Sequence, residues 1–193
     1  GFCFCFAQLY HPAMRFAGPV RAALKTRTIF NILGPLTTPA HPDYALIGVY
    51  SPDLLETVAQ TLRLLGVKRA YVVHGSGLDE AAVHGTTEIA ELKEDGTDLG
   101  AKRLYSIEEI KGGAPADNAL ITEAILAGKG TEAQQAFVTA NLALLLKIGG
   151  LAKSLPEAVE LARRTMASGK GLEVLNAHLA YAASHTASSQ KAA

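Results

Sequence analysis

The chain has 193 residues, of which 49% are hydrophobic and 19% are charged. This length and composition are typical of one globular domain or two small ones, and they exclude a chain that is disordered throughout. Eighteen basic residues balance eighteen acidic ones, so no overall positive field draws the chain to nucleic acid or to anionic lipid. Any anionic ligand must therefore be bound by a local group of residues.

Eight of the first nine residues are apolar, a pattern typical of a buried strand. Their longest apolar run, residues 1–7, is too short to cross a bilayer, and no basic segment precedes it as in a secretory signal. We therefore expect a cytoplasmic protein that does not bind membranes. Cys3 and Cys5 would share one face of the strand at a spacing poorly suited to a disulfide, so we expect both to be buried free thiols.

A helix is predicted next. It begins at His11 and Pro12, where proline is tolerated in the first turn, and it runs to Leu24 with a bend at Pro19. A connection rich in proline and threonine follows at residues 34–42. The sequence contains no internal repeat, so we expect the chain to form one unit.

A βαβ unit begins with the apolar run at residues 44–50, which is typical of a strand. Residues 51–53 (SPD) supply a helix N-cap, a first-turn proline and an acid near the positive end of the helix dipole, and Gly66 ends that helix. Residues 70–74 form the next strand. We expect the two strands to be parallel with a right-handed connection, and a ligand to lie beyond their carboxyl ends, near residues 75–80.

The second half of the chain is predicted to be mostly helical. Residues 86–92 and 101–105 have the pattern of a hairpin at the edge of the sheet. Capping boxes at Ser106 and Thr131 begin the first helices of this half. Five apolar residues at helical spacing are expected to face the core: Phe137, Ala140, Leu144, Leu145 and Ile148.

Two closing helices are expected at residues 156–167 and 171–184, followed by a disordered tail at residues 185–193 that is rich in alanine and serine. The fold class is therefore α/β, with one domain over residues 1–184 and a helix-rich second half.

Asp79 and Glu80 follow the glycine-rich turn at residues 75–77 after a single leucine, at the end of a predicted parallel strand. Mg²⁺ usually keeps several waters and takes one or two protein carboxylates together with substrate phosphate oxygens, so this pair suits a magnesium site. Adjacent acids are also common at a helix N-terminus, where they complement the dipole. The turn itself could present N–H groups to an anion or serve only to reverse the chain.

Arg21 and Arg27 flank the end of the first predicted helix. A guanidinium there could hold a carboxylate through two parallel hydrogen bonds, although surface and capping arginines are commoner. The six histidines include neither an H-E-x-x-H motif nor a pair four residues apart, which argues against a histidine metal site. The sequence also has no nucleophile elbow and no basic stretch interleaved with aromatic residues.

Five sequence blocks resemble the anthranilate phosphoribosyltransferase family in order and spacing. They are residues 10–14 (YHPAM), 19–21 (PVR), 27–36 (RTIFNILGPL), 47–52 (IGVYSP) and 74–80 (HGSGLDE). Residues 113–118 (GAPADN) and the later helices are similar to the C-terminal region of the family. The resemblance covers the chain except for the tail.

The resemblance implies part of the large α/β domain of the nucleoside phosphorylase/phosphoribosyltransferase-like fold, with a central sheet and flanking helices. The implied reaction transfers the phosphoribosyl group from phosphoribosyl pyrophosphate to anthranilate, with Mg²⁺ as cofactor, and gives N-(5-phosphoribosyl)anthranilate and pyrophosphate. This is the second step of tryptophan biosynthesis.

Positions that match the family motifs imply the site residues. Arg21 would bind the anthranilate carboxylate, and His11 and Pro35 would shape the aromatic pocket. Asp79 and Glu80 would hold Mg²⁺ against the pyrophosphate. No single catalytic side chain is expected, because the neutral amine of anthranilate needs little base catalysis and positioning and the metal dominate.

Part of the family pattern does not occur in this sequence. The G-T-G-G-D phosphate loop and the K-H-G-N-R segment, which in the family supply most contacts to phosphoribosyl pyrophosphate, are absent. Most of the helical domain that forms the family's homodimer interface is missing as well. We therefore expect the C-terminal part of such an enzyme, inactive alone, with residues 1–7 interior in the complete fold.

Three alternatives stay open: a nucleic-acid-binding paralogue of the same fold without transferase activity, a remnant that neither folds well nor catalyses, and a pyrimidine nucleoside phosphorylase. The net charge of zero and residues 27–36 argue against the first. The blocks around Arg21 and Pro35 fit the anthranilate enzymes better than the last.

Overall fold

The computed structural model describes residues 2–92 and 105–190. Within these ranges three strands form one sheet in the order β1-β2-β3, made of Tyr44–Gly48, Arg69–Gly75 and Thr87–Glu91. β1 and β2 are parallel, and β3 is antiparallel to β2. The predicted βαβ unit with parallel strands is therefore confirmed, as is the strand at residues 86–92.

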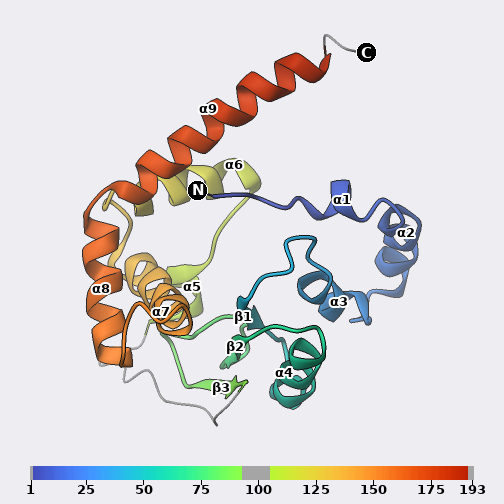
Figure 1. Cartoon of the computed structure of the whole chain (residues 1–193), viewed down its shortest axis with the longest axis horizontal. Coiled ribbons are helices and arrows are strands. Elements are labelled where there is room, and N and C mark those ends of the chain that lie inside the picture. Colours follow the sequence, from blue (N-terminus) through green and yellow to red (C-terminus); the bar gives the residue numbers. More distant parts are fainter. Residues whose placement is uncertain (1, 93–104, 191–193) are drawn as a thin grey trace.

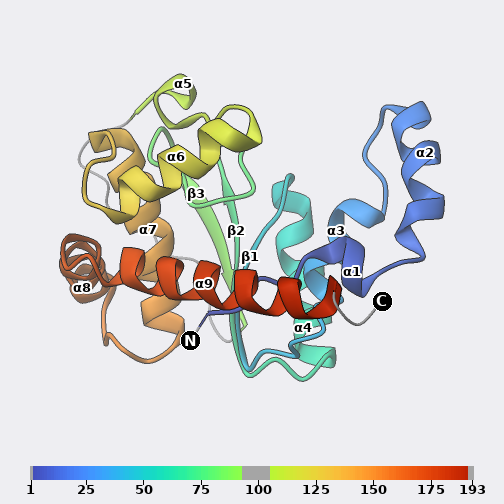
Figure 2. The ribbon, with the colours of Figure 1, turned by 90° about the horizontal axis from the view of Figure 1, so that it is seen from above.

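The central strand β2 is buried on both faces. Ala70 and Val72 belong to one apolar cluster, and Tyr71 and Val73, which point to the opposite face, belong to another. The first cluster contains the buried residues of α4 (Leu55–Leu64), and the second contains Leu144 and other residues of α7 (Glu132–Ile148). Figure 2 shows the sheet between these two helices. The molecule thus has the helix–sheet–helix layers of an α/β fold.

The other helices lie around these layers. They are α1 (Ala7–Tyr10), α2 (Met14–Leu24), α3 (Phe30–Leu36), α5 (Ile107–Ile110), α6 (Pro115–Leu126), α8 (Leu155–Ala167) and α9 (Lys170–Gln190), with the 3-10 turn η1 (Pro52–Leu54) before α4. Figure 1 shows α2 and α3 on one side of the sheet and α5, α7 and α8 on the other. α8 packs on α7 through a cluster of small residues that includes Ala143, Ala158 and Ala162.

The helix starts in the second half follow local sequence. Both capping boxes are present, at Ser106 before α5 and at Thr131 before α7. Thr131 Oγ1 accepts a hydrogen bond from the backbone N–H of Gln134 at 3.2 Å. No helix in the described part of the chain combines the length and the apolar character needed to span a membrane.

The start of the chain differs from its prediction. Residues 2–6 have no regular structure and lead into the short helix α1, and the side chains of Phe4 and Leu9 are 67% and 77% exposed. Cys3 is exposed and Cys5 half-buried, and both are free. The prediction of a buried strand with buried thiols is wrong in this structure, because an apolar segment is buried only where a second layer faces it.

Three other local predictions also differ. Residues 34–36 belong to α3 instead of a connection, since Gly34 and Pro35, two poor helix formers, are tolerated at its end. Ser51 precedes η1 but makes no side-chain cap; its hydroxyl donates to Asp53 Oδ2 at 3.4 Å. Leu145 is 48% exposed, because it lies beside the arc of α7 that faces the sheet.

The closing helices are present with shifted ends. α8 and α9 match the predicted helices, but α9 continues to Gln190 and so includes most of the predicted tail. The second strand of the predicted hairpin, residues 101–105, lies outside the described residues except for Tyr105, which is not in a strand.

Candidate functional site

The segment that carries Asp79 crosses the carboxyl ends of β1 and β2. After β2 the chain reverses in a turn closed by two backbone hydrogen bonds between Gly75 and Leu78, at 2.9 and 3.0 Å. Gly77 has a φ of 97°, a value that glycine adopts at little cost. The turn places Asp79 directly against the end of β1.

Two glycines make this close approach possible. A Cβ on Gly48, the last residue of β1, would overlap the backbone carbonyl group of Asp79. A Cβ on Gly75, the last residue of β2, would overlap the carbonyl oxygen of Glu80. Both strands therefore end in glycine where the acidic segment passes over them.

His74 holds the turn from the strand side. Its side chain is buried, its Nδ1 donates to the carbonyl oxygen of Val49 at 2.9 Å, and its Nε2 accepts from the backbone N–H of Gly77 at 3.3 Å. This pair of bonds is that of a neutral imidazole with its proton on Nδ1. His74 therefore ties the end of β1 to the turn after β2.

Two further side chains hold the residues after Glu80. The side-chain amide of Asn141 on α7 accepts from the N–H of Ala81 at 3.0 Å and donates to the carbonyl oxygen of Ala81 at 3.3 Å. Thr87 Oγ1 accepts from the N–H of Ala82 at 2.8 Å. The sequence pattern indicates none of these positioning residues, because a single polar residue in an apolar element carries no periodic signal.

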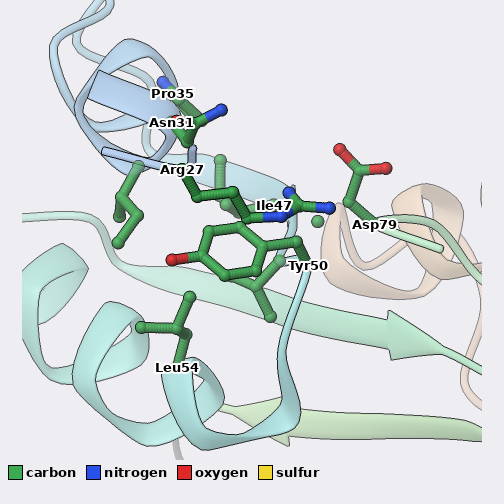
Figure 3. Close-up of a pocket in the computed structure, with 10 residues that line it drawn as sticks. Arg27, Asn31, Pro35, Ile47, Tyr50, Leu54 and Asp79 are labelled. Atoms are coloured by element: carbon green, nitrogen blue, oxygen red, sulfur yellow. The ribbon is translucent and has the colours of Figure 1, made fainter. Parts of the chain in front are cut away.

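A cavity of about 60 Å³ opens beside Asp79 (Figure 3). Besides Asp79, its lining includes Arg27 just before α3, Asn31 and Pro35 on α3, and Tyr50 just after β1. The helix α3 is held here by Ile32 and Leu36, which pack against the apolar cluster shared by β1 and α4. Complete ligand pockets usually measure ~300–1,000 Å³, so this cavity is the size of one subsite.

The structure brings two of the five predicted site residues into this cavity, Asp79 and Pro35. Glu80 follows Asp79 but does not line the cavity. Arg21 lies on α2 with its guanidinium carbon 5.7 Å from the ring centre of Phe30, and His11 lies before α2. Neither Arg21 nor His11 lines the cavity, so their roles stay predictions from the family motifs.

Partial burial raises the pKa of Glu80 above its usual value of 4.5, and the neighbouring Asp79 carboxylate raises it further. A cation beside the pair would relieve both effects. Within residues 2–92 and 105–190 no three His, Cys, Asp or Glu residues gather into a group that could hold a metal. The two carboxylates fit Mg²⁺ in the mode in which phosphate oxygens and waters complete the coordination.

Replacing Glu80 by glutamine is expected to stabilise the fold at pH 7 but not at about pH 3. Because the pKa of Glu80 is raised in the native state, that state binds more protons than the unfolded chain between the two pKa values, and the wild type loses stability as the pH rises through this window. Glutamine does not titrate, and solvent screening keeps the gain below about 1 kcal/mol. Urea unfolding in metal-free buffer at both pH values measures the difference. If the free energies of unfolding of Glu80→Gln and the wild type differed by the same amount at both pH values, the raised pKa of Glu80 would be contradicted.

Comparison with known proteins gives consistent matches. Residues 1–172 match the family model described as the glycosyl transferase family, a/b domain. The anthranilate phosphoribosyltransferase of Tolumonas auensis is 57% identical over 180 residues, which are 89% of this chain and 53% of that protein. The enzyme of the same name from Shewanella putrefaciens is 52% identical over 182 residues, 90% of this chain and 52% of its own length.

Two solved structures have the same arrangement. Anthranilate phosphoribosyltransferase from Thermus thermophilus superposes with a TM-score of 0.86 at 38% identity, covering 93% of this chain and 55% of that one. The enzyme from Saccharomyces cerevisiae in complex with PRPP and Mg gives a TM-score of 0.76 at 25% identity, covering 86% of this chain and 49% of that one. The chain thus spans about half the length of the relatives that it matches.

Proposed function

Because the chain belongs to the glycosyl transferase family through its α/β domain and is similar to anthranilate phosphoribosyltransferases within it, we propose that it takes part in phosphoribosyl transfer to anthranilate. The predicted family and fold class are confirmed by these matches. The observation that supports the activity is the placement of Asp79 at the carboxyl ends of two parallel strands, in one cavity with Pro35 of α3. In an open α/β sheet this is the edge at which ligands bind.

The proposed roles divide between two groups of residues. Asp79 and Glu80 would hold Mg²⁺, which when bound supplies charge stabilisation for the departing pyrophosphate. Arg21 would orient anthranilate through its carboxylate, while His11 and Pro35 would shape the space around the aromatic ring. Attack by a neutral amine makes positioning the main contribution of these side chains.

The activity is proposed for the chain together with the part of its relatives that it does not span. The G-T-G-G-D and K-H-G-N-R segments do not occur in its sequence. That the matched share is the C-terminal one, that the complete protein is a homodimer and that it is cytoplasmic stay predictions. The alternative of a nucleic-acid-binding paralogue is not supported, since the relatives compared above carry the transferase name.

The test follows the loss of anthranilate fluorescence in the presence of phosphoribosyl pyrophosphate and Mg²⁺. The chain is assayed alone and mixed with the remaining half of the Tolumonas auensis relative. We expect no turnover by the chain alone and turnover in the mixture. Turnover by the chain alone would show that it does not need the missing phosphate segments, and no turnover in a mixture of folded halves would contradict the proposed function.

In that mixture, Asp79→Asn is expected to lower Mg²⁺-dependent kcat/KM by about tenfold or more, because it removes a charged ligand beside the leaving group. Arg21→Gln should instead raise the KM for anthranilate with little change in the KM for phosphoribosyl pyrophosphate. Glu88→Gln, which changes an exposed acid on β3, is the matched control and should leave kcat/KM and the KM for anthranilate unchanged. If all three variants had the same kinetics, the roles proposed for Asp79 and Arg21 would be wrong.

A further inference from the structure

In the described part of the chain, no acidic side chain forms a salt bridge with the guanidinium of Arg27. Its guanidinium carbon lies 4.1 Å from the ring centre of Tyr50. Figure 3 shows the side chain reaching across this ring on the side of Asp79. A stacked guanidinium keeps its N–H groups at its edge, so the stack orients Arg27 without using its hydrogen-bond donors.

The same cavity offers a second donor. The backbone N–H of Thr28 donates to Asn31 Oδ1 at 2.8 Å, which orients the side-chain amide. The side-chain amino group of Asn31 makes no hydrogen bond with the described residues, and Asn31 is one of the residues that line the cavity. A guanidinium and an amide from neighbouring positions therefore line one small space.

Asp79 lines this space without forming a salt bridge with Arg27. A carboxylate and a guanidinium that share a cavity but do not neutralise each other remain available to a ligand with both cationic and anionic parts. A magnesium phosphate group has this composition, since Mg²⁺ is shared between protein carboxylates and phosphate oxygens.

We infer that Arg27 and Asn31 form an oxyanion subsite for a phosphate oxygen of the phosphoribosyl donor, with Tyr50 as the residue that positions Arg27. This inference rests on the proposed function. Arginine suits the task because its planar fork binds phosphate oxygens through two parallel hydrogen bonds. The carboxylate of the acceptor is assigned to Arg21, which contacts Phe30 and lies outside this cavity.

The first test measures binding of magnesium pyrophosphate to the chain by calorimetry. Arg27→Gln is expected to weaken binding about tenfold or more, since a hydrogen bond to a charged group is lost, and Arg27→Lys should restore part of the affinity by keeping the charge. Tyr50→Leu should weaken binding by less than Arg27→Gln.

Arg15→Gln is the matched control. Arg15 also stacks on an aromatic ring, with its guanidinium carbon 4.7 Å from the ring centre of the exposed Phe16, but it does not line the cavity. Its replacement should leave the affinity unchanged. Equal affinity of the wild type and Arg27→Gln, or no binding of pyrophosphate by the folded wild-type chain, would overturn the inference.

The second test separates this inference from the proposed function. In the mixture of halves, Arg27→Gln should raise the KM for phosphoribosyl pyrophosphate and not the KM for anthranilate. Turnover with an unchanged donor KM would overturn the subsite and leave the proposed function standing. If the wild-type mixture shows no turnover, the proposed function fails, and the pyrophosphate affinities of Arg27→Gln and Arg15→Gln still decide whether the subsite exists.

Discussion

Gly48→Ala is expected to displace Asp79 from the cavity and to abolish most of the magnesium pyrophosphate binding. The added Cβ would overlap the backbone carbonyl of Asp79, and backbone cannot move aside as the end of a flexible side chain can. The segment is also held on its far side by Asn141 through Ala81, so relief must break one of these contacts. We expect a loss of about 2 kcal/mol or more in the free energy of unfolding and at least a tenfold loss of affinity.

Urea unfolding and calorimetry of Gly48→Ala measure the two effects separately. Gly18→Ala is the matched control, because Gly18 lies within α2 and a Cβ there would have no atom within 4 Å apart from its chain neighbours and the backbone of its own helix. Alanine favours a helix over glycine, so this variant should be as stable as the wild type or slightly more stable. A Gly48→Ala protein with wild-type affinity would show that the position of Asp79 does not matter for binding.

Leu144→Ala is expected to lower the free energy of unfolding by about 3 kcal/mol, because it leaves a cavity in the apolar cluster between α7 and the sheet. Leu144 is fully buried there with Tyr71 and Val73 of β2. Urea unfolding measures the loss.

Leu145→Ala provides an internal comparison one residue away. Leu145 is 48% exposed, so its replacement should cost less than about 1 kcal/mol. The sequence pattern places both leucines in one core-facing stripe, and only the structure separates them. Similar losses in the two variants would contradict the observed orientation of α7.

The apolar start of the chain shows where hydrophobic pattern alone fails. Residues 2–9 have the composition of a buried strand, yet Phe4 and Leu9 are exposed. A run of apolar residues indicates a need for burial, but burial also requires a facing layer, and hydrophobicity along the chain contains no information about that layer. The same limit applies to Leu145 on α7.

The candidate site likewise contains some residues that the sequence could predict and others that it could not. Asp79 could be found from the sequence because it follows an apolar run and a glycine-rich turn, two strong local signals. Tyr50, Asn141 and His74 could not be found, since the first belongs to a pattern read as strand and the others are single polar residues in apolar elements. Their contacts join residues separated by up to 60 positions in the chain, and such pairs have no local signature.

The amino-acid sequence by itself determined the βαβ unit, its parallel strands, the capping boxes and the place of the acidic pair at the end of β2. Each of these depends on residues close together in the chain, where periodicity, caps and turns act directly on the backbone. Only the tertiary structure decided that Gly48 lies under Asp79 and that Arg27 stacks on Tyr50 beside it. These contacts depend on how α3 and the segment after β2 pack against the end of β1, because packing brings distant residues to within a few ångströms of each other.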